Sequence, residues 1–311
     1  MLRKLLKNTI AKTISYLIYK VDYKEYFNFF ENKGFHITPV NFDQPIPQLA
    51  TLPNDLWNKE SKLVEININE NNQINLLSQF SRFRVEYDNF PRNKTKIPYE
   101  YYGNNKEFES CDGEILYSII RHFKPKRILE IGSGYSTMLS AQAILKNREE
   151  NASYECELTA IEPLPNEILT KGFPGLSKLI HGIGQDVPLT EFRKLSVNDI
   201  LFIDSSHVLK TGSDVQYEFL EILPRLGRGV FVHIHDVFLP REYPKEWILE
   251  EHRFWTEQYL LQAFLSFNDA FEVLWAGSYM HLRHPDELEA AFSWYNRNKK
   301  WPASFWIRKT R

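Results

Sequence analysis

Short apolar runs alternate with helix-like segments through the second half of the chain. Runs rich in valine, isoleucine, leucine and phenylalanine predict five strands, of which the first is expected to be buried on both faces. These runs lie at 128–131, 158–161, 178–181, 199–203 and 229–234. The alternation is typical of parallel strands joined by right-handed crossovers. Two later runs, at 271–276 and 304–307, are expected to close the sheet as an antiparallel pair. We therefore predict an α/β fold with about seven mostly parallel strands and helices on both faces.

Helices are predicted on either side of the first strand. Residues 112–123 place apolar side chains on one helical face. After the strand, Ser136 or Thr137 is expected to cap a helix that runs to Leu145. A further helix is expected at 212–223.

The first 108 residues lack this alternation. Residues 21–108 are polar, turn-prone and rich in asparagine, tyrosine, phenylalanine and proline. They predict an irregular lobe with one helix near 72–83. We therefore divide the chain into an N-terminal helix and lobe at 1–108 and a sheet domain at 109–311, with an insertion at about 237–268.

Residues 1–20 carry five lysine or arginine side chains and no acid, and their apolar residues recur at helical spacing. The lysines interrupt the apolar run too often for a membrane span or a signal peptide. Two interpretations stay open. The helix either lies on an anionic membrane surface or docks on the protein itself or on a partner.

Composition limits the class of protein. The chain has 311 residues, of which 43% are hydrophobic and 25% charged, as in an ordinary folded globular protein. Its formal net charge of -2 gives no reason to expect a nucleic-acid partner. Two cysteines, Cys111 and Cys156, allow at most one disulfide, so a reducing cytoplasmic location is expected.

The first strand runs directly into a glycine turn, Gly132, Ser133 and Gly134. Glycine allows a tight turn without a Cβ clash. A strand, turn and helix in this order present backbone N–H groups at the carboxyl edge of a parallel sheet, where open α/β sheets bind nucleotide-like ligands. Two glycines alone also fit a simple tight connection.

Carboxylates recur where the predicted strands end. They are Glu130, Glu162, Asp186, Asp204 and Asp236. A parallel sheet gathers such side chains along one edge. Each alone is typical of a helix N-cap or a surface loop, but their repetition indicates a binding site.

Glu162 helps to distinguish between cofactors. A carboxylate after the second strand can accept both hydroxyls of an adenosine ribose. A nicotinamide-binding turn would usually add a third glycine where Thr137 stands, and Glu130 inside the first strand is unexpected there. The pattern therefore disfavours a nicotinamide cofactor.

Several pieces of the sequence resemble one family. ILEIGSG followed by AIEP looks like the class I S-adenosylmethionine-dependent methyltransferases. GQDVP, DILFIDSSH and HIHDVFLPREYP look like a subgroup of small-molecule O-methyltransferase-like proteins associated with polysaccharide or secondary-metabolite pathways, as do TPVNFDQPIP and EYDNFP. The resemblance covers about 112–276 and implies a Rossmann-like fold with S-adenosylmethionine as methyl donor.

The resemblance also implies which residues bind the cofactor. Gly132, Ser133 and Gly134 are the candidates for contact with its methionine portion. Glu162 is the candidate for its ribose, and Gln185 with Asp186 for its adenine amino group. Other residues of the turn and of the strand ends complete the set of candidate cofactor residues. These are Glu130, Tyr135, Ser136 and Asp204.

Methyl transfer from a sulfonium requires aligned reactants and removal of the acceptor's proton. His207 and His235 are the candidate bases, because imidazole titrates near neutral pH, and Asp236 is the third catalytic candidate. For each histidine, a buried ring bonded to the backbone is the rival interpretation.

Asp204 and Asp236 are also candidate Mg²⁺ ligands, because this ion accepts few carboxylates together with water and substrate oxygens. Catechol-type methyltransferases are similar in having acids at these two strand ends, usually followed by an asparagine or a further acid. Val237 follows Asp236 here, so the third ligand would be His235 or come from elsewhere.

We expect the acceptor to be a hydroxyl of a small molecule or glycan. Four side chains of the insertion either contact this acceptor or pack into the core. They are Arg241, Tyr243, Trp247 and Trp255. The alternatives are a non-catalytic protein of the same fold that binds a nucleoside or a partner and, ranked last, a nicotinamide-dependent oxidoreductase.

Overall fold

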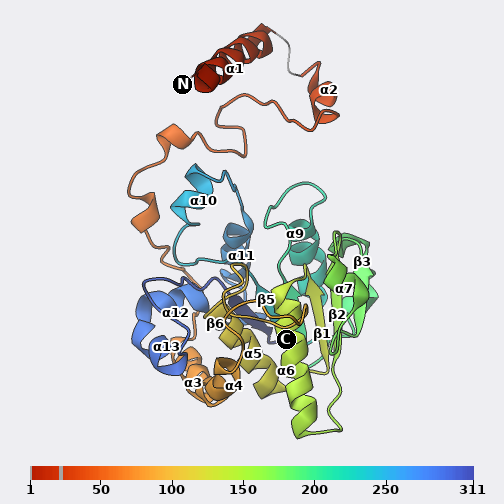
Figure 1. Ribbon diagram of the computed structural model, residues 1–311. Helices are drawn as coiled ribbons and strands as arrows, with labels where there is room; N and C mark the ends of the chain where they lie inside the picture. The colour runs from red at the N-terminus through yellow and green to blue at the C-terminus, as the bar shows by residue number, and fades with distance from the viewer. Residues whose placement is uncertain (1, 21–23) are drawn as a thin grey trace. The chain divides into compact units, whose positions relative to one another are not determined.

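The computed structural model describes residues 2–20 and 24–311 (Figure 1). The chain divides into two compact units, Met1–Leu56 and Trp57–Arg311. Residue 1 of the predicted terminal helix and residues 21–23 of the predicted lobe lie outside the described residues.

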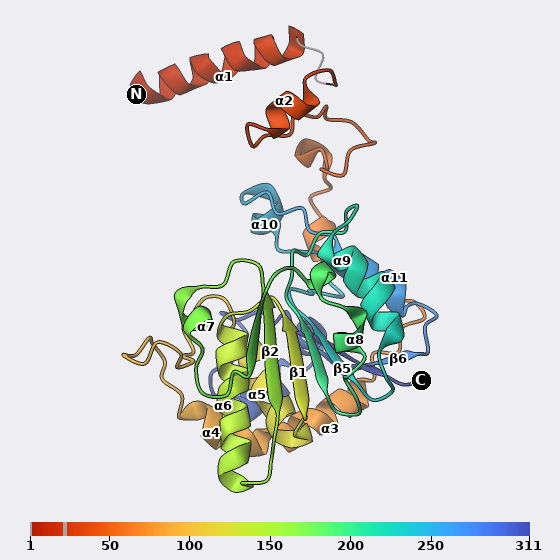
Figure 2. The same ribbon diagram turned by 90° about the vertical axis from the view of Figure 1, so that its right-hand side faces the viewer.

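The second unit is built on one seven-stranded sheet (Figure 2). Its strands are β1 Arg127–Ile131, β2 Glu157–Glu162, β3 Lys178–His181, β4 Ile200–Ile203, β5 Phe231–Ile234, β6 Phe271–Ala276 and β7 Phe305–Lys309. The spatial order is β3-β2-β1-β4-β5-β7-β6, and β7 pairs antiparallel with both β5 and β6. The predicted fold class and the predicted antiparallel closure are therefore confirmed. Strand order reverses between β1 and β4, the position at which open α/β sheets form ligand-binding crevices.

Helices cover both faces of this sheet. The helices of this unit are α3 Glu70–Phe80, α4 Arg84–Asp88, α5 Asp112–Phe123, α6 Tyr135–Glu150, α7 Glu167–Lys171, α8 Leu189–Phe192, α9 Asp214–Tyr217, α10 Lys245–Leu249, α11 Glu257–Leu265, α12 Gly277–Arg283 and α13 Pro285–Ala291. Successive strand residues point to opposite faces, and β4 shows this directly. Phe202 packs in the core with α5 and α6, whereas Leu201 and Ile203 pack in a second core with α11. Because a core lies on each face of the sheet, both sides of β4 are buried and apolar.

Residues 57–108 belong to the sheet unit, whereas the sequence places them in the N-terminal lobe. The helix expected near 72–83 is present as α3 and the short turn that follows it. Leu77 and Phe80 enter the sheet's core, and Gln73 Oε1 accepts a hydrogen bond from the Ala276 N–H at 2.8 Å. The residues that make these contacts lie far apart in the sequence, so local composition does not reveal the contacts.

Two predicted helices differ in their limits. Gly134 is the N-cap of α6, and the Thr137 hydroxyl accepts the Gly134 N–H at 3.0 Å, so the predicted cap at Ser136 or Thr137 is wrong. The helix expected at 212–223 begins with α9 and passes into a π-helical segment at Glu218–Ile222. Such segments occur frequently at functional sites.

The first unit contains α1 Leu2–Lys20 and α2 Phe27–Glu31. The predicted terminal helix is therefore present, and the side chains of Leu6, Ile10 and Leu17 are exposed. Among the described residues, no helix combines the length and the apolar character that crossing a membrane requires. Contact of residues 1–20 with a membrane surface stays a prediction.

Candidate functional site

Gly132 turns the chain where β1 ends. Its φ is +79°, in the left-handed region that favours glycine, and a Cβ there would lie 1.9 Å from the backbone oxygen of Asp204. The Gly132 N–H donates to the Ile161 oxygen at 3.0 Å, and the Asp204 N–H donates to the Ile131 oxygen at 2.9 Å. The ends of β1, β2 and β4 are thereby joined around this glycine.

Gly134 is free of such constraints. Its φ of 179° is extended backbone that any residue adopts, and no atom lies within 4 Å of the position of a Cβ. This residue lines a cavity together with Ser133, Tyr135 and Ser136. The two glycines therefore have different structural roles. Gly132 allows the close approach of β1 and β4, whereas Gly134 leaves space at the cavity wall.

Glu162 lies beside the same turn. Its Oε2 accepts the Ser133 N–H at 3.1 Å, and its Oε1 accepts the Leu164 N–H at 2.9 Å. The side chain is half-buried, so it keeps an accessible edge. The structure thus brings the glycine turn and the acid after β2 together at one rim of the sheet.

Gln185 and Asp186 follow β3 in a short 3₁₀ turn, Gly184–Asp186. A Cβ on Gly184 would lie 3.3 Å from the Ile131 side chain, which shows that this turn packs against the end of β1. Gln185 Nε2 donates to the Gly212 oxygen at 3.2 Å. These two candidates therefore lie at the same edge of the sheet as the glycine turn, but outside the lining of the cavity described next.

The cavity at this edge has a volume of about 420 Å³. Its lining comes from five segments of the chain: Glu107 and Phe108; Ser133 to Ser136; Asp204 to His207; His235 and Asp236; and Arg253 with Trp255. A larger hollow of about 830 Å³ opens at the amino ends of β1 and β2 and is lined by several lysine and arginine side chains. We place the site at the smaller cavity, because parallel sheets bind ligands at the carboxyl ends of their strands.

Glu130 lies beneath the turn and has no exposed surface. Its Oε1 accepts the Ser136 hydroxyl at 2.5 Å, while its Oε2 has no hydrogen-bond partner among the described residues. Burial raises the pKa of Glu130 to about 8, against the opposing hydrogen bonds from Ser136 and Thr137. The residue is therefore protonated at neutral pH and lies behind the cavity wall.

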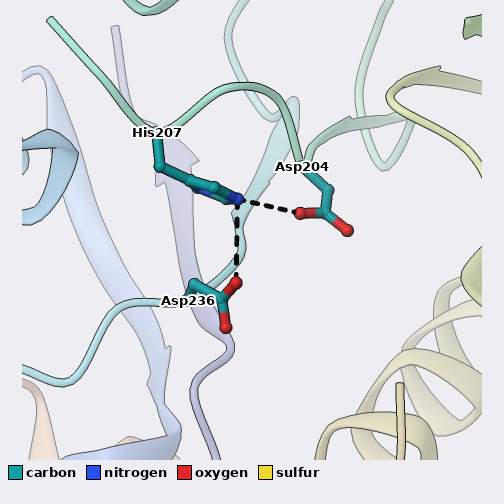
Figure 3. A group of neighbouring side chains, drawn as sticks. All are labelled: Asp204, His207 and Asp236. Atoms are coloured by element: carbon teal, nitrogen blue, oxygen red, sulfur yellow. Dashed lines mark ion pairs between the residues drawn. The ribbon is translucent and has the colours of Figure 1, made fainter. Parts of the chain in front are cut away.

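Asp204, His207 and Asp236 converge on one point of the cavity (Figure 3). Asp204 directly follows β4 and Asp236 lies two residues after the end of β5, and these strands are neighbours in the sheet. His207 Nε2 lies 3.3 Å from Asp204 Oδ1 and 3.6 Å from Asp236 Oδ2. The sequence names these three residues as candidates, and the structure brings them together.

His207 is held from its other side by residues of the insertion. Its Nδ1 hydrogen-bonds Glu257 Oε2 at 2.8 Å, and its ring lies 4.2 Å from the Trp255 ring. The His207 oxygen accepts the N–H groups of Thr256 and Glu257. Burial opposes the charged imidazole, but the bonds to Asp204 and Glu257 outweigh it and raise the pKa of His207 well above its ordinary value.

His235 occupies a different place from the one expected of a third metal ligand. Its Nε2 lies 3.8 Å from Asp236 Oδ1, and its ring lies 5.1 Å from the Phe108 ring. The nitrogen that faces both carboxylates belongs to His207. Burial lowers the pKa of His235, yet the charges of Asp236 and Asp204 outweigh this and raise it above its ordinary value.

The insertion contributes only part of what its sequence indicates. Trp255 lines the cavity, whereas Tyr243 is buried and its hydroxyl accepts the Gln258 N–H at 3.1 Å. Arg241 pairs with Glu60 at 3.1 Å. Trp247 packs against the rings of its aromatic neighbours Phe238 and Trp255.

Sequence reasoning missed several contributors to the site. Glu257 orients His207, and Arg253 and Phe108 line the cavity. Glu257 lies at the first position of α11. Acids are common there because they interact favourably with the helix dipole, so its position in the sequence does not indicate that it bonds His207. Tyr135 lines the cavity as well, with its hydroxyl 2.8 Å from that of Tyr102.

Comparisons with known proteins agree with this geometry. Residues 129–237 match the model of a family described as a methyltransferase domain. A protein of Archaeoglobus fulgidus, described as uncharacterized, is 29% identical over 175 residues, which are 52% of this chain and 75% of that relative. The matched residues contain the end of β1, β2 to β5, the glycine turn and the convergent acids. Together with the sheet, this match identifies residues 129–237 as a methyltransferase domain of the class I, S-adenosylmethionine-dependent type.

Proposed function

We propose that this protein transfers a methyl group from S-adenosylmethionine to a hydroxyl of a small molecule or glycan. The observation that carries the proposal is one cavity whose wall combines the glycine turn with a cluster of imidazole and carboxylate groups. The first part suits a methyl donor, and the second suits a polar acceptor that loses a proton. The site residues below are part of this proposal.

The cofactor's methionine portion lies against Ser133 and Gly134, where no side chain fills the space. Glu162 accepts the ribose hydroxyls with the lone pairs that Ser133 and Leu164 leave free. Gln185 and Asp186 lie near the adenine. Glu130 supports this wall through its bond to the Ser136 hydroxyl.

The acceptor hydroxyl lies on the far side of the transferred methyl, toward Asp204 and Asp236. His235, which lines the cavity beside Asp236, is the base that takes the hydroxyl proton. His207 is held on both ring nitrogens and acts with the two aspartates. Mg²⁺ at these aspartates stays a prediction.

Titration calorimetry with S-adenosylhomocysteine tests the cofactor half of the proposal. We expect Glu162→Gln to bind about 10–100-fold more weakly than wild type, because a charged acceptor of two hydroxyls is lost. The matched control is Glu157→Gln at the other, exposed end of β2, which should bind as wild type. Absence of heat with the wild-type protein would contradict the proposal.

Formation of S-adenosylhomocysteine from S-adenosylmethionine tests the acceptor half. Panels of hydroxylated small molecules and glycans are compared with the same compounds carrying O-methyl groups. We expect turnover with a member of the first panel only, and His235→Gln should lower kcat more than it changes KM. Cofactor binding without turnover in either panel would favour the non-catalytic alternative.

A further inference from the structure

Three potential ligand atoms for a cation converge at the acceptor side of the cavity. One atom each of Asp204, His207 and Asp236 lies within 4.8 Å of the other two. Asp204 and Asp236 lie within two residues of the ends of neighbouring strands, and His207 lies in the loop after β4. All three line the cavity, so a ligand reaches them from the same space as the substrate.

The surroundings of His207 match those of a metal-binding histidine. Such residues usually bond their second ring nitrogen to a carboxylate, which fixes the ring and raises the basicity of the first nitrogen. Glu257 does this here at 2.8 Å from Nδ1. It has 1% of its surface exposed, and its Oε1 has no partner among the described residues.

The charges around this point are unbalanced. Four carboxylates surround it: Asp204, Asp236, Glu257 and Glu218. Glu218 is fully buried, carries one oxygen without a partner, and comes from the π-helical segment after α9. In the described part of the chain, no lysine or arginine pairs with any of the four, and Arg253 of the cavity wall is already paired with Glu251 at 2.7 Å. The only basic side chains that pair with the four in the described residues are His207 and His235, so carboxylates outnumber cations here and the cluster favours a further cationic ligand.

Two of the three residues also have unusual backbone conformations. His207 has φ of 60° and Asp236 has φ of 55°, in a region that side chains other than glycine rarely adopt. Hydrogen bonds from the start of α11 hold the His207 loop in this conformation. Backbone strain of this kind concentrates at ligand-binding sites, which agrees with a binding role for both residues.

We propose that Asp204, His207 and Asp236 bind one divalent first-row transition-metal ion, with Glu257 as the residue that positions His207. An imidazole nitrogen combined with two carboxylates suits Mn²⁺, Fe²⁺, Co²⁺ or Zn²⁺ better than Mg²⁺, which prefers oxygen ligands alone. When bound, such an ion would lower the pKa of a coordinated acceptor hydroxyl. That consequence rests on the proposed function, whereas binding of the ion is tested independently of it.

Electron paramagnetic resonance of Mn²⁺ tests this proposal on the full chain without cofactor. Free Mn²⁺ gives a strong six-line spectrum that bound ion loses, so the free concentration is read directly. We expect one Mn²⁺ per chain, displaced by Zn²⁺ at far lower concentration than by Mg²⁺. His207→Gln and Asp236→Asn should bind at least about tenfold more weakly, and Glu257→Gln about 10–100-fold more weakly.

The matched control is His284→Gln. His284 also bonds a glutamate, Glu70, but it lies away from the cavity, and this variant should bind Mn²⁺ as wild type. Circular dichroism confirms that each variant is folded. If folded wild type leaves the Mn²⁺ spectrum unchanged, or if the site variants bind as tightly as wild type, the metal proposal is wrong.

Failure of this proposal is distinguishable from failure of the proposed function. If the protein binds S-adenosylhomocysteine but not Mn²⁺, only the metal proposal is wrong. The cation that the carboxylates attract would then be the sulfonium of the methyl donor. Mn²⁺ binding without S-adenosylhomocysteine binding supports the metal site and overturns the methyltransferase.

Discussion

Gly132→Ala is expected to destabilise the protein by at least ~3 kcal/mol. The added Cβ would lie 1.9 Å from the Asp204 backbone oxygen, and it would also have to adopt a φ of +79°. Neither conflict can be relieved by rotating a side chain, since the clash is with the end of β4. Denaturant unfolding of the variant, followed by circular dichroism, measures the loss.

Gly134→Ala is the matched control for this prediction. Its Cβ would enter open space with an extended backbone, so the free energy of unfolding should stay close to that of wild type. Binding of S-adenosylhomocysteine should nevertheless weaken, because the methyl group projects into the cavity. Equal stability losses for the two variants would contradict our distinction between the two glycines.

Glu130→Gln is expected to remove a large part of the pH dependence of stability. Burial raises the pKa of Glu130 to about 8 in the folded protein, from an ordinary value of 4.5. Its contribution to stability is therefore complete below pH 4.5 and is lost as pH rises toward 8, at about 1.4 kcal/mol per pH unit. Between pH 5 and pH 7 the wild-type protein should lose about 3 kcal/mol more than the variant.

Urea unfolding at a series of pH values measures this difference. Glu157→Gln, an exposed position on the neighbouring strand, should retain the wild-type dependence. Parallel stability curves for wild type and Glu130→Gln would show that Glu130 ionises as an ordinary carboxyl, which its lack of exposed surface makes costly.

The sheet and its binding edge were accessible from the sequence because their signals are local. β4 is read from a continuous apolar run, and the acids at or just after the ends of β2, β4 and β5 mark the edge at which parallel strands end. The glycine turn is read from two glycines that a single serine separates. Its two glycines could not be told apart, because the Asp204 oxygen that crowds Gly132 lies on another strand.

The remaining features depend on contacts between distant residues. Glu257 meets His207 across 50 positions, so no spacing rule identifies the pair, and His235 was the nearer choice beside Asp236. The polar, turn-prone composition of residues 57–108 predicts an irregular lobe, whereas apolar residues such as Leu77 and Phe80 pack into the core of the sheet unit. The cap of α6 was placed at a hydroxyl side chain, whereas glycine occupies it and Thr137 bonds back to it.

A crystal structure with S-adenosylhomocysteine tests the central claim most directly. We predict the sulfur beside Gly134, the ribose hydroxyls on Glu162, and open space from the sulfur toward Asp204 and Asp236. A ligand bound at another surface, with both Gly134 and Glu162 untouched, would contradict the account.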